Sequence, residues 1–403
     1  MRKPFDLLIV GGGPVGWACA LAATRASEQM RHPLSIALVD ASPPRAVPTG
    51  LFEPRVYTVT EENLAWCRDS RVAFDAARLC DVSEICVFDQ QGSQALNVSA
   101  RDARRPRLAS VIEHDTLTHA LAARAEKAGV EFVEASIGES GVLDQDRYVE
   151  TSRGALLNAK LVIVAEGARS KLRAALQIAT VERDYERFGV VAHFSVRAPH
   201  LGQARQWFLP DRTILALLPL PDVDGAPAVS MVWSCSPEQA ERLKLLTAAA
   251  LCEAVSVASR NQVNIDRALS SPQAFPLRLL RASDPVAERA ILVGDAAHAV
   301  HPLAGQGVNL GLGDAIGLQA ALASSSAVGF DVGHPLVTTK FRRLRYTAVL
   351  AMQTATDGLA RLYNLDQSLF AMQPTALATV ADAGMRVLGR LPAFRRALSS
   401  AAS

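Results

Sequence analysis

Residues 5–16, which read FDLLIVGGGPVG, decide the fold of this chain. The apolar run Phe5–Val10 predicts a buried strand, and the glycines after it predict a tight turn. The small apolar residues Trp17–Ala23 predict a helix packed closely on a sheet. Ser35–Asp40 is a second apolar run, and it ends in an acid 24 residues beyond Gly16. This strand–turn–helix–strand order predicts an α/β, Rossmann-like domain that binds a dinucleotide.

Each glycine of the turn has a separate predicted role. Gly11 lets the chain turn, Gly13 lets a pyrophosphate approach the backbone, and Gly16 lets the helix pack on the strand. The helix that begins at Pro14–Val15 supplies free N–H groups and a partial positive charge for the phosphates. Asp40 is expected to accept hydrogen bonds from a ribose diol. The alternative interpretation is an ordinary glycine-rich turn, but the flanking strands and the acid favour dinucleotide binding.

The composition excludes several classes of protein. The chain has 403 residues, of which 49% are hydrophobic and 20% charged, so it has material for two or three folded domains. Its 42 basic and 40 acidic residues leave a net charge of +2, which gives no field for holding nucleic acid. The six cysteines form no CxxC pair, which favours a reduced cytoplasmic protein without a metal site. No apolar run approaches the ~20 residues needed to span a bilayer, so at most the protein lies on a membrane.

The middle of the chain changes character twice. Ser110–Gly129 predicts a helix, with Leu117, Leu121 and Ala125 on one face, and Val130–Ala135 predicts a strand. Leu161–Ala165 predicts another buried strand, and the segment after it, Glu166–Ser170, suggests a second place where backbone meets a ligand.

An antiparallel sheet is expected between about residues 180 and 280. Three alternating segments separated by proline- and aspartate-rich turns predict its strands: Gly189–Val196, Thr213–Leu218 and Ala228–Trp233. Glu238–Arg260 predicts a helix, and helices are expected from Phe341 onward. The expected domains are 1–178 and 284–340 for the dinucleotide, with some segments of about 60–110 belonging to the substrate domain, then 179–283 for the substrate and 341–403 as C-terminal helices.

The most informative stretch follows a predicted strand at Arg289–Val293. It runs from Gly294 to Ala315 and contains repeated glycines and two histidines, His298 and His301. The histidines could be a zinc pair or buried residues with local partners, and a metal is disfavoured because no further ligand stands at a suitable spacing. Gly305, Gln306 and Gly307 lie at a predicted helix start, where backbone amides can hold an anionic ring.

The last segment, Met385–Leu398, mixes arginines with apolar residues. One interpretation is a terminal helix packed on the body of the protein. The other is a basic amphipathic helix that contacts a membrane surface.

Three of these features, in this order, carry a family resemblance. The turn Gly11–Gly16, the segment Ala165–Arg173 and the run Gly294–Gly311 resemble those of the class A flavoprotein aromatic hydroxylases. Within that group the chain looks most like the ubiquinone-biosynthesis hydroxylases, over about its whole length. Further shared features are Tyr185, Trp207–Pro210, Leu217–Leu220, Val232–Ser234, Phe275–Leu277 and the helical tail after Phe341.

The resemblance implies FAD as the cofactor, with Gly11, Gly13, Gly16 and Asp40 holding its ADP half. Asp295 is expected near the ribityl–pyrophosphate region, and Gly305, Gln306 and Gly307 along the flavin ring. The remaining cofactor residues that the resemblance implies are Pro14, Val15, Arg55, Gly167, Gly294, Pro302, Val308 and Asn309. One position departs from the family pattern: Glu166 stands where Asp is usual, which puts the contacts of that motif in question.

The resemblance implies an NAD(P)H- and O2-dependent monooxygenase that hydroxylates the ring of a prenylated phenol in ubiquinone biosynthesis, through a flavin C4a-hydroperoxide. NAD(P)H would bind only transiently, and His298 or His301 could assist proton transfer. The expected location is the cytoplasm, with a peripheral contact to the inner membrane face or to a biosynthetic complex. Two alternatives stay open: another flavoenzyme on the same fold, such as an epoxidase or lipid reductase, and a catalytically weak flavoprotein subunit. The ring position, the tail length, the choice between NADH and NADPH and the oligomeric state stay open as well.

Overall fold

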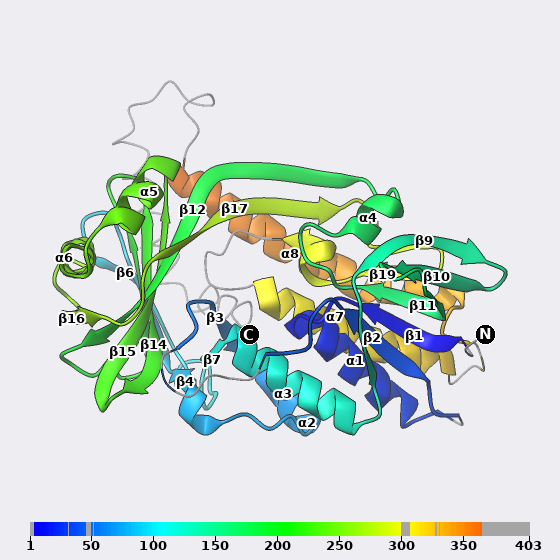
Figure 1. Cartoon of the computed structure of the whole chain (residues 1–403). Coiled ribbons are helices and arrows are strands. Elements are labelled where there is room, and N and C mark those ends of the chain that lie inside the picture. The colour runs from blue at the N-terminus through cyan, green and yellow to red at the C-terminus, as the bar shows by residue number, and fades with distance from the viewer. Residues whose placement is uncertain are drawn as a thin grey trace.

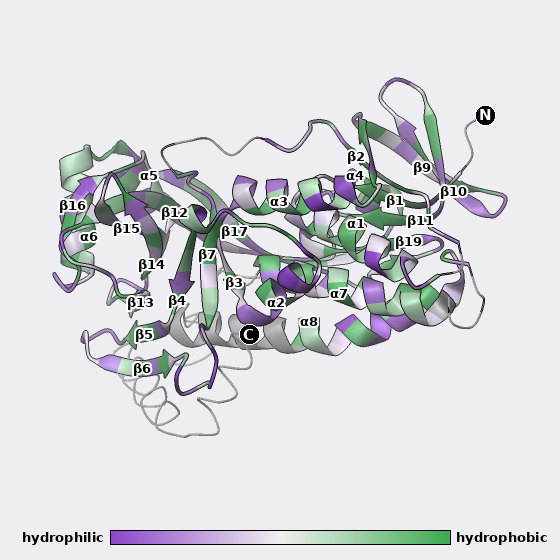
Figure 2. Ribbon diagram, turned by 90° about the horizontal axis from the view of Figure 1, so that it is seen from below, coloured by the Kyte–Doolittle hydropathy of each residue, from purple (hydrophilic) through white to green (hydrophobic). Residues whose placement is uncertain are grey.

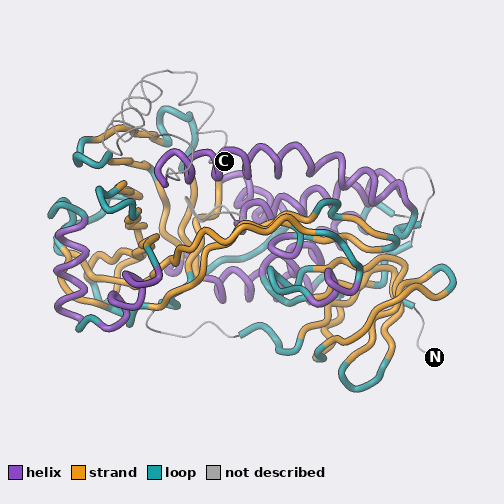
Figure 3. Tube along the Cα trace, turned by 90° about the horizontal axis from the view of Figure 1, so that it is seen from above, coloured by secondary structure: helices purple, strands orange, loops and turns teal. Residues whose placement is uncertain are grey.

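The computed structural model describes residues 4–30, 32–45, 50, 52–299, 307–326, 329 and 331–364. Two large sheets lie at opposite ends of the molecule, and a small sheet lies between them (Figure 1). Figure 3 shows that the long helix α8 (Pro335–Asn364) runs alongside both large sheets.

The first sheet has a parallel core. Its order is β18-β19-β11-β1-β2-β8, and β1 pairs in parallel with β11 and β2. Its strands are β1 (Phe5–Val10), β2 (Ile36–Asp40), β8 (Glu131–Glu134), β11 (Leu156–Val164), β18 (Val286–Ala287) and β19 (Ala290–Leu292), with the hairpin β9 (Ile137–Leu143) and β10 (Asp146–Thr151) attached to β11. The strands predicted at the N-terminus and at Leu161–Ala165 are therefore confirmed.

Both faces of this sheet are buried. Leu7 and Ile9 pack into one core with helices α1 (Pro14–Ser27), α3 (His114–Lys127) and α7 (Gly307–Ser326), whereas Leu8 and Val10 pack into a second core on the other face. That second core includes Leu172 of the short helix α4 (Lys171–Ala175). Such continuous apolar runs are typical of parallel strands, and Figure 2 shows the hydrophobic residues gathered there.

The second sheet is mostly antiparallel, in the order β20-β17-β12-β15-β14-β13-β5-β6 with β16 beside β12. The strands are β5 (Glu84–Phe88), β6 (Gln94–Ser99), β12 (Thr180–Val196), β13 (Gln203–Phe208), β14 (Ile214–Val223), β15 (Ala226–Cys235), β16 (Ile265–Ala268), β17 (Gln273–Ala282) and β20 (His298–Ala299). The three predicted strands lie in β12, β14 and β15, so they are confirmed. Figure 1 shows the long strands β12 and β17 reaching from this sheet towards α4.

Helices α5 (Pro237–Leu245) and α6 (Ala248–Ala258) cover the outer face of the second sheet. The single helix predicted over Glu238–Arg260 is wrong in this respect. The chain is extended at Leu246, and the Thr247 side chain then accepts a hydrogen bond from the N–H of Ala250, which starts a new helix.

The small sheet has the order β3-β7-β4 and consists of β3 (Val56–Thr60), β4 (Leu79–Val82) and β7 (Ala109–Glu113). Helix α2 (Glu61–Asp69) and the 3-10 turn η1 (Ala76–Arg78) connect β3 to β4. The helix predicted over Ser110–Gly129 is wrong at its start, because residues 110–113 belong to β7 and the helix α3 begins at His114. The β-branched pair Val111-Ile112 is stabilised as strand by pairing with β3 and β4, which no local pattern reveals.

In the described part of the chain, no helix has the length and apolar character that crossing a membrane requires. The segment Met385–Leu398 lies outside the described residues. The proposed domain boundaries stay a prediction.

Candidate functional site

The site forms where the parallel strands end. Four parallel strands end at this site. Gly11–Gly13 follow β1, Asp40 is the last residue of β2, Glu166–Gly167 lie just beyond β11, and Gly294–Asp295 lie just beyond β19. Ligands of open α/β sheets bind outside these carboxyl ends. We call these four segments, with the starts of α1, α3 and α7, the cofactor site.

The glycine turn has the geometry that its sequence predicts. Gly11 has a φ of +113°, and a Cβ there would lie 2.4 Å from the Ala165 carbonyl oxygen. A Cβ at Gly16 would lie 1.9 Å from the Gly11 oxygen, so only glycine fits the contact between helix and strand. A Cβ at Gly13, in contrast, would meet no atom within 4 Å. The space above Gly13 is therefore open to a ligand.

Among the described residues, no side chain caps the first N–H groups of α1, which begins directly after this open space. Gly13 is the N-cap, Pro14 is the first helical residue, and no side chain caps the helix. The Asp40 carboxylate lies next to the turn, because it accepts hydrogen bonds from the N–H of Gly12 at 2.6 Å and of Ser42 at 3.0 Å. A carboxylate has about four lone-pair sites, so Asp40 keeps capacity for a ligand hydroxyl.

The Asp295 carboxylate has unused hydrogen-bonding capacity. No residue in the described ranges donates a hydrogen bond to it. Burial raises the pKa of Asp295, and the positive charge of Arg55 opposes that rise. A Cβ at Gly307 would lie 3.9 Å from Asp295 Oδ1, which places the carboxylate beside the start of α7. The Asp295 side chain is half-buried, and the hydroxyls of a ligand would supply the donors that it lacks among the described residues.

Arg55, Tyr57 and His114 form a second group at the site. The exposed guanidinium of Arg55 lies 5.3 Å from the centre of the Tyr57 ring, and the Tyr57 hydroxyl lies 2.8 Å from His114 Nδ1. Burial and the charge of Arg55 lower the pKa of His114 to about 4, so the ring is neutral at pH 7. Nδ1 then accepts a hydrogen bond from the Tyr57 hydroxyl, and Nε2 carries the ring proton. Tyr57 and His114 were not predicted from the sequence, because their only signal there is a position next to a strand end.

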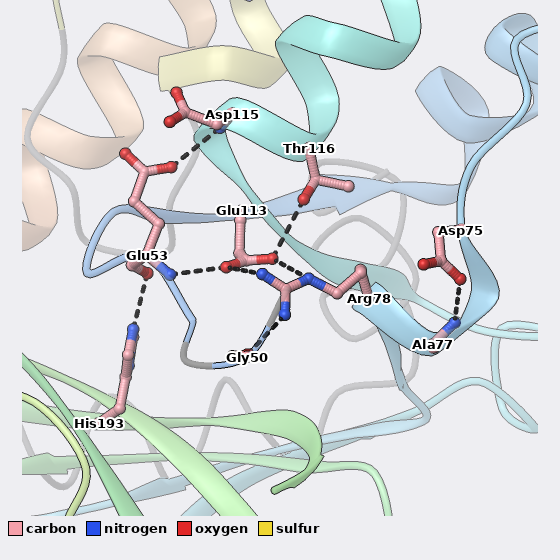
Figure 4. Close-up of polar contacts among 9 residues, drawn as sticks. All are labelled: Gly50, Glu53, Asp75, Ala77, Arg78, Glu113, Asp115, Thr116 and His193. Atoms are coloured by element: carbon pink, nitrogen blue, oxygen red, sulfur yellow. Dashed lines mark hydrogen bonds and ion pairs between the residues drawn. The ribbon is translucent and has the colours of Figure 1, made fainter. Parts of the chain in front are cut away.

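Several hydrogen bonds fix the backbone that carries Arg55 (Figure 4). The Glu53 N–H donates to Glu113 at 2.6 Å, the Glu53 side chain accepts from the N–H of Asp115 at 2.9 Å, and His193 Nε2 donates to the Glu53 carbonyl at 2.7 Å. Arg78 pairs with the buried Glu113 carboxylate at 2.8 and 2.9 Å. Because His193 lies on β12, this cluster joins the second sheet to the cofactor site.

The face of the second sheet that carries His193 has three apolar residues beside it. Val191, Val232 and Ala216 are cross-strand neighbours on β12, β15 and β14, and all three are half-buried. Further along the same face, Leu220 packs against residues of β4 and β7. The described residues thus leave an apolar strip, Val191–Val232–Ala216, on the side of the sheet that faces the cofactor site.

Other expected residues have different surroundings. The Val308 side chain is buried in the first core, and the Asn309 side chain bonds to Thr58, Thr60 and Asn63, so both side chains are engaged within the protein. Gly167 has a φ of +81° and open space at its Cβ position.

The Glu166 carboxylate turns back to its own chain, where it accepts hydrogen bonds from the Ser170 hydroxyl at 2.6 Å and the Leu172 N–H at 2.9 Å. The extra methylene is therefore used to hold the start of α4.

His298 is 4% exposed and bonded to Asp314, which separates it from solvent. The expected residues His301, Pro302, Gly305 and Gln306 lie outside the described residues. Among the residues that the structure describes, no three His, Cys, Asp or Glu side chains gather as a metal site would require.

Comparison with known proteins points to one family. The profile of the FAD binding domain family matches residues 5–327. The ubiquinone biosynthesis monooxygenase COQ6 of Xenopus tropicalis is 32% identical, over 90% of this chain and 87% of that protein. The ubiquinone hydroxylase UbiL of Rhodospirillum rubrum is 28% identical, over 93% of this chain and 84% of that protein.

Solved structures agree on the fold. The p-nitrophenol 4-monooxygenase PnpA of Pseudomonas putida superposes with a TM-score of 0.73 at 17% identity, over 99% of this chain and 98% of that chain. HpxO of Klebsiella pneumoniae, complexed with FAD and uric acid, superposes with a TM-score of 0.74 at 13% identity, over 99% and 96% of the two chains.

Proposed function

Because the chain belongs to the family of FAD-binding monooxygenases that includes the ubiquinone biosynthesis hydroxylases, we propose that it hydroxylates the aromatic ring of a prenylated phenol. It is an FAD-dependent monooxygenase of ubiquinone biosynthesis, and NAD(P)H is its electron donor, as is typical of the family. The observation that supports the prenylated substrate is the half-buried apolar strip Val191–Val232–Ala216, on the face of the second sheet that also carries His193.

The residues of the cofactor site fit FAD. The open space at Gly13 and the free N–H groups of α1 suit a pyrophosphate, and Asp40 suits a ribose. The Asp295 carboxylate, which no described residue bonds, suits the ribityl hydroxyls. When bound, FAD supplies the transfer of one oxygen atom from O2 to an electron-rich ring, after reduction by NAD(P)H.

The protein's own contribution is orientation, charge and exclusion of water. The amides at the start of α7, from Gly307, offer partial positive charge to an anionic ring beside Asp295. The Glu53 cluster holds Arg55 and its positive charge at the same site. The apolar strip on the second sheet holds the substrate ring and tail and keeps water away. Binding moves the CH₂ groups of the tail from water to an apolar surface, which favours a long prenyl tail.

Such a substrate resides in a bilayer, because each buried CH₂ contributes about 0.8 kcal/mol to partitioning. The enzyme therefore collects it at the inner membrane face from the cytoplasmic side, or receives it within a biosynthetic complex. The segment Met385–Leu398 is the proposed membrane contact, on the basis of its sequence alone.

The test compares two phenols, one prenylated and one with the same ring but no tail. With purified protein, NAD(P)H and O2, we expect the prenylated phenol to give a ring-hydroxylated product with a kcat/KM at least about tenfold higher, since two buried CH₂ groups already supply that factor. Equal kcat/KM values would contradict the proposed use of the apolar strip. An epoxide or a reduced product would identify another flavoenzyme of the same fold, and no oxidation of NAD(P)H would identify a catalytically weak subunit.

A further inference from the structure

Asp314 is a buried carboxylate in the middle of α7, with 1% of its surface exposed. Its Oδ2 accepts hydrogen bonds from the Gly294 N–H at 2.8 Å and from His298 Nε2 at 2.7 Å. Its Oδ1 accepts a hydrogen bond from Arg345 Nε at 2.8 Å. Burial by itself would raise the pKa of Asp314, but the His298 ring, the Arg345 guanidinium and the Gly294 N–H bring it below the usual value. The Asp314 carboxylate is thus ionised, and both of its oxygens accept hydrogen bonds from the protein.

The two bonds to Oδ2 fix both ends of one short turn. Gly294 begins this turn and His298 follows it, and Asp295 of the cofactor site lies between them. The Val15 side chain packs closely against the start of the turn, since a Cβ at Gly294 would lie 3.1 Å from it, so the turn is held from this side as well. A displacement of the Asp314 carboxylate would therefore displace Asp295.

Arg345 reaches Asp314 from α8 by passing over two glycines of α7. A Cβ at Gly313 would lie 2.7 Å from Arg345 Nη2, and a Cβ at Gly317 would lie 2.7 Å from Arg345 Cδ. The same guanidinium donates to the Leu310 carbonyl at 3.0 Å. Glycine inside a helix is about 1 kcal/mol less stable than alanine, so the two glycines that make room for Arg345 lower the stability of α7.

We propose that Asp314 and Arg345 are positioning residues for the cofactor site, which hold the Gly294–His298 turn so that the Asp295 carboxylate meets the FAD hydroxyls. Asp314 makes the direct bonds to the turn, and Arg345 keeps the Asp314 carboxylate charged and oriented. The inference rests on FAD binding and is independent of the identity of the phenol.

A buried ion pair with a purely structural role would have a different signature. Its loss would lower the melting temperature of the apoprotein, but the folded fraction would still bind FAD with the same Kd and the same flavin midpoint potential. Loss of a positioning role changes the Kd and the potential, since the Asp295 carboxylate then sits elsewhere relative to the flavin.

The experiment uses the full chain with Arg345→Gln and Asp314→Asn, and Arg342→Gln as the matched control. Arg342 lies on the same helix and pairs with Asp284 at the same kind of distance, 2.7 Å, but both side chains of that pair are 43% exposed. We measure the Kd for FAD by titration of the apoprotein and the flavin midpoint potential, both at a temperature where each variant is folded.

Arg345→Gln and Asp314→Asn are expected to raise the Kd for FAD by roughly tenfold or more and to shift the potential, because each removes a hydrogen bond to a charged group. Arg342→Gln should leave the Kd within about twofold, as exposed pairs contribute little. If Asp314→Asn does not fold, Arg345→Gln decides alone. Wild-type Kd and potential in a folded Arg345→Gln variant would overturn the proposal.

Discussion

Gly13→Val should weaken FAD binding strongly and leave the apoprotein folded. A side chain at position 13 would enter the open space above the glycine turn, where no protein atom lies within 4 Å of the Cβ position. The backbone of Gly13 is extended, with φ −73° and ψ 176°, which valine adopts without strain. The substitution thus adds volume only where the pyrophosphate is expected.

The loss of apoprotein stability and the loss of FAD binding have separate causes. Valine is a poorer N-cap than glycine, so the apoprotein should lose about 1 kcal/mol, which for a chain of 403 residues lowers the melting temperature by ~1 °C. Overlap with the ligand should cost about 3 kcal/mol, which weakens FAD binding by roughly a hundredfold. The assay combines a thermal melt of the apoprotein with the flavin absorption retained after gel filtration.

Gly16→Val is the contrasting variant. Its Cβ would lie 1.9 Å from the Gly11 carbonyl oxygen, which cannot move aside as a flexible side chain would. The apoprotein itself should therefore lose about 3 kcal/mol or more. A folded Gly13→Val protein that keeps stoichiometric FAD would refute the assignment of this turn.

Four further outcomes are expected. Asp295→Asn should weaken FAD binding but stabilise the apoprotein at pH 7, because burial raises the pKa of Asp295 above 3.8 and the ionised carboxylate destabilises the folded state. Thermal melts should show the gap in melting temperature between variant and wild type shrinking as the pH falls to 3.8 and below. Burial lowers the pKa of His114 to about 4, so the wild-type apoprotein should lose stability as the pH falls below 6.5, by about 2 kcal/mol at pH 5. Urea denaturation should show a smaller loss for His114→Gln over the same pH range. Equal losses in the two proteins would contradict this prediction. Arg78→Ala leaves the buried Glu113 carboxylate unpaired and should cost about 3–5 kcal/mol in the free energy of unfolding, whereas a loss below about 1 kcal/mol would mean that water replaces the arginine. Truncation after Gly384, a prediction from sequence alone, should reduce co-sedimentation with anionic liposomes at unchanged FAD content; equal sedimentation would assign the tail to ordinary packing.

The parallel sheet and its glycine turn could be predicted because their signals are local. Val10, Gly11 and Gly16 meet within one strand–turn–helix unit, so spacing along the chain translates directly into geometry. The alternating strands of the second sheet are local signals of the same kind. For Asp295 the resemblance named the residue, and the structure adds that its half-buried carboxylate has no hydrogen-bond donor among the described residues.

Features that depend on distant pairing could not be predicted. Residues 110–113 look helical beside the amphipathic pattern that follows, yet they pair with strands from two other parts of the chain. The Glu53 cluster joins residues up to 140 positions apart, such as Glu53 and His193. Asp314 and Arg345 are single charged residues in helical patterns. Their ion pair and the bond of Asp314 to the Gly294 N–H follow only from the packing of α7 against α8 and the Gly294–His298 turn.

Oxygen-isotope labelling tests the central claim most directly. Purified holoprotein is supplied with NAD(P)H, a prenylated phenol and ¹⁸O2, and the product is analysed by mass spectrometry. We predict one new hydroxyl on the aromatic ring, with its oxygen derived from ¹⁸O2 and none from water. A product that lacks the label in its ring, or that carries it as an epoxide in the prenyl tail, would contradict the account.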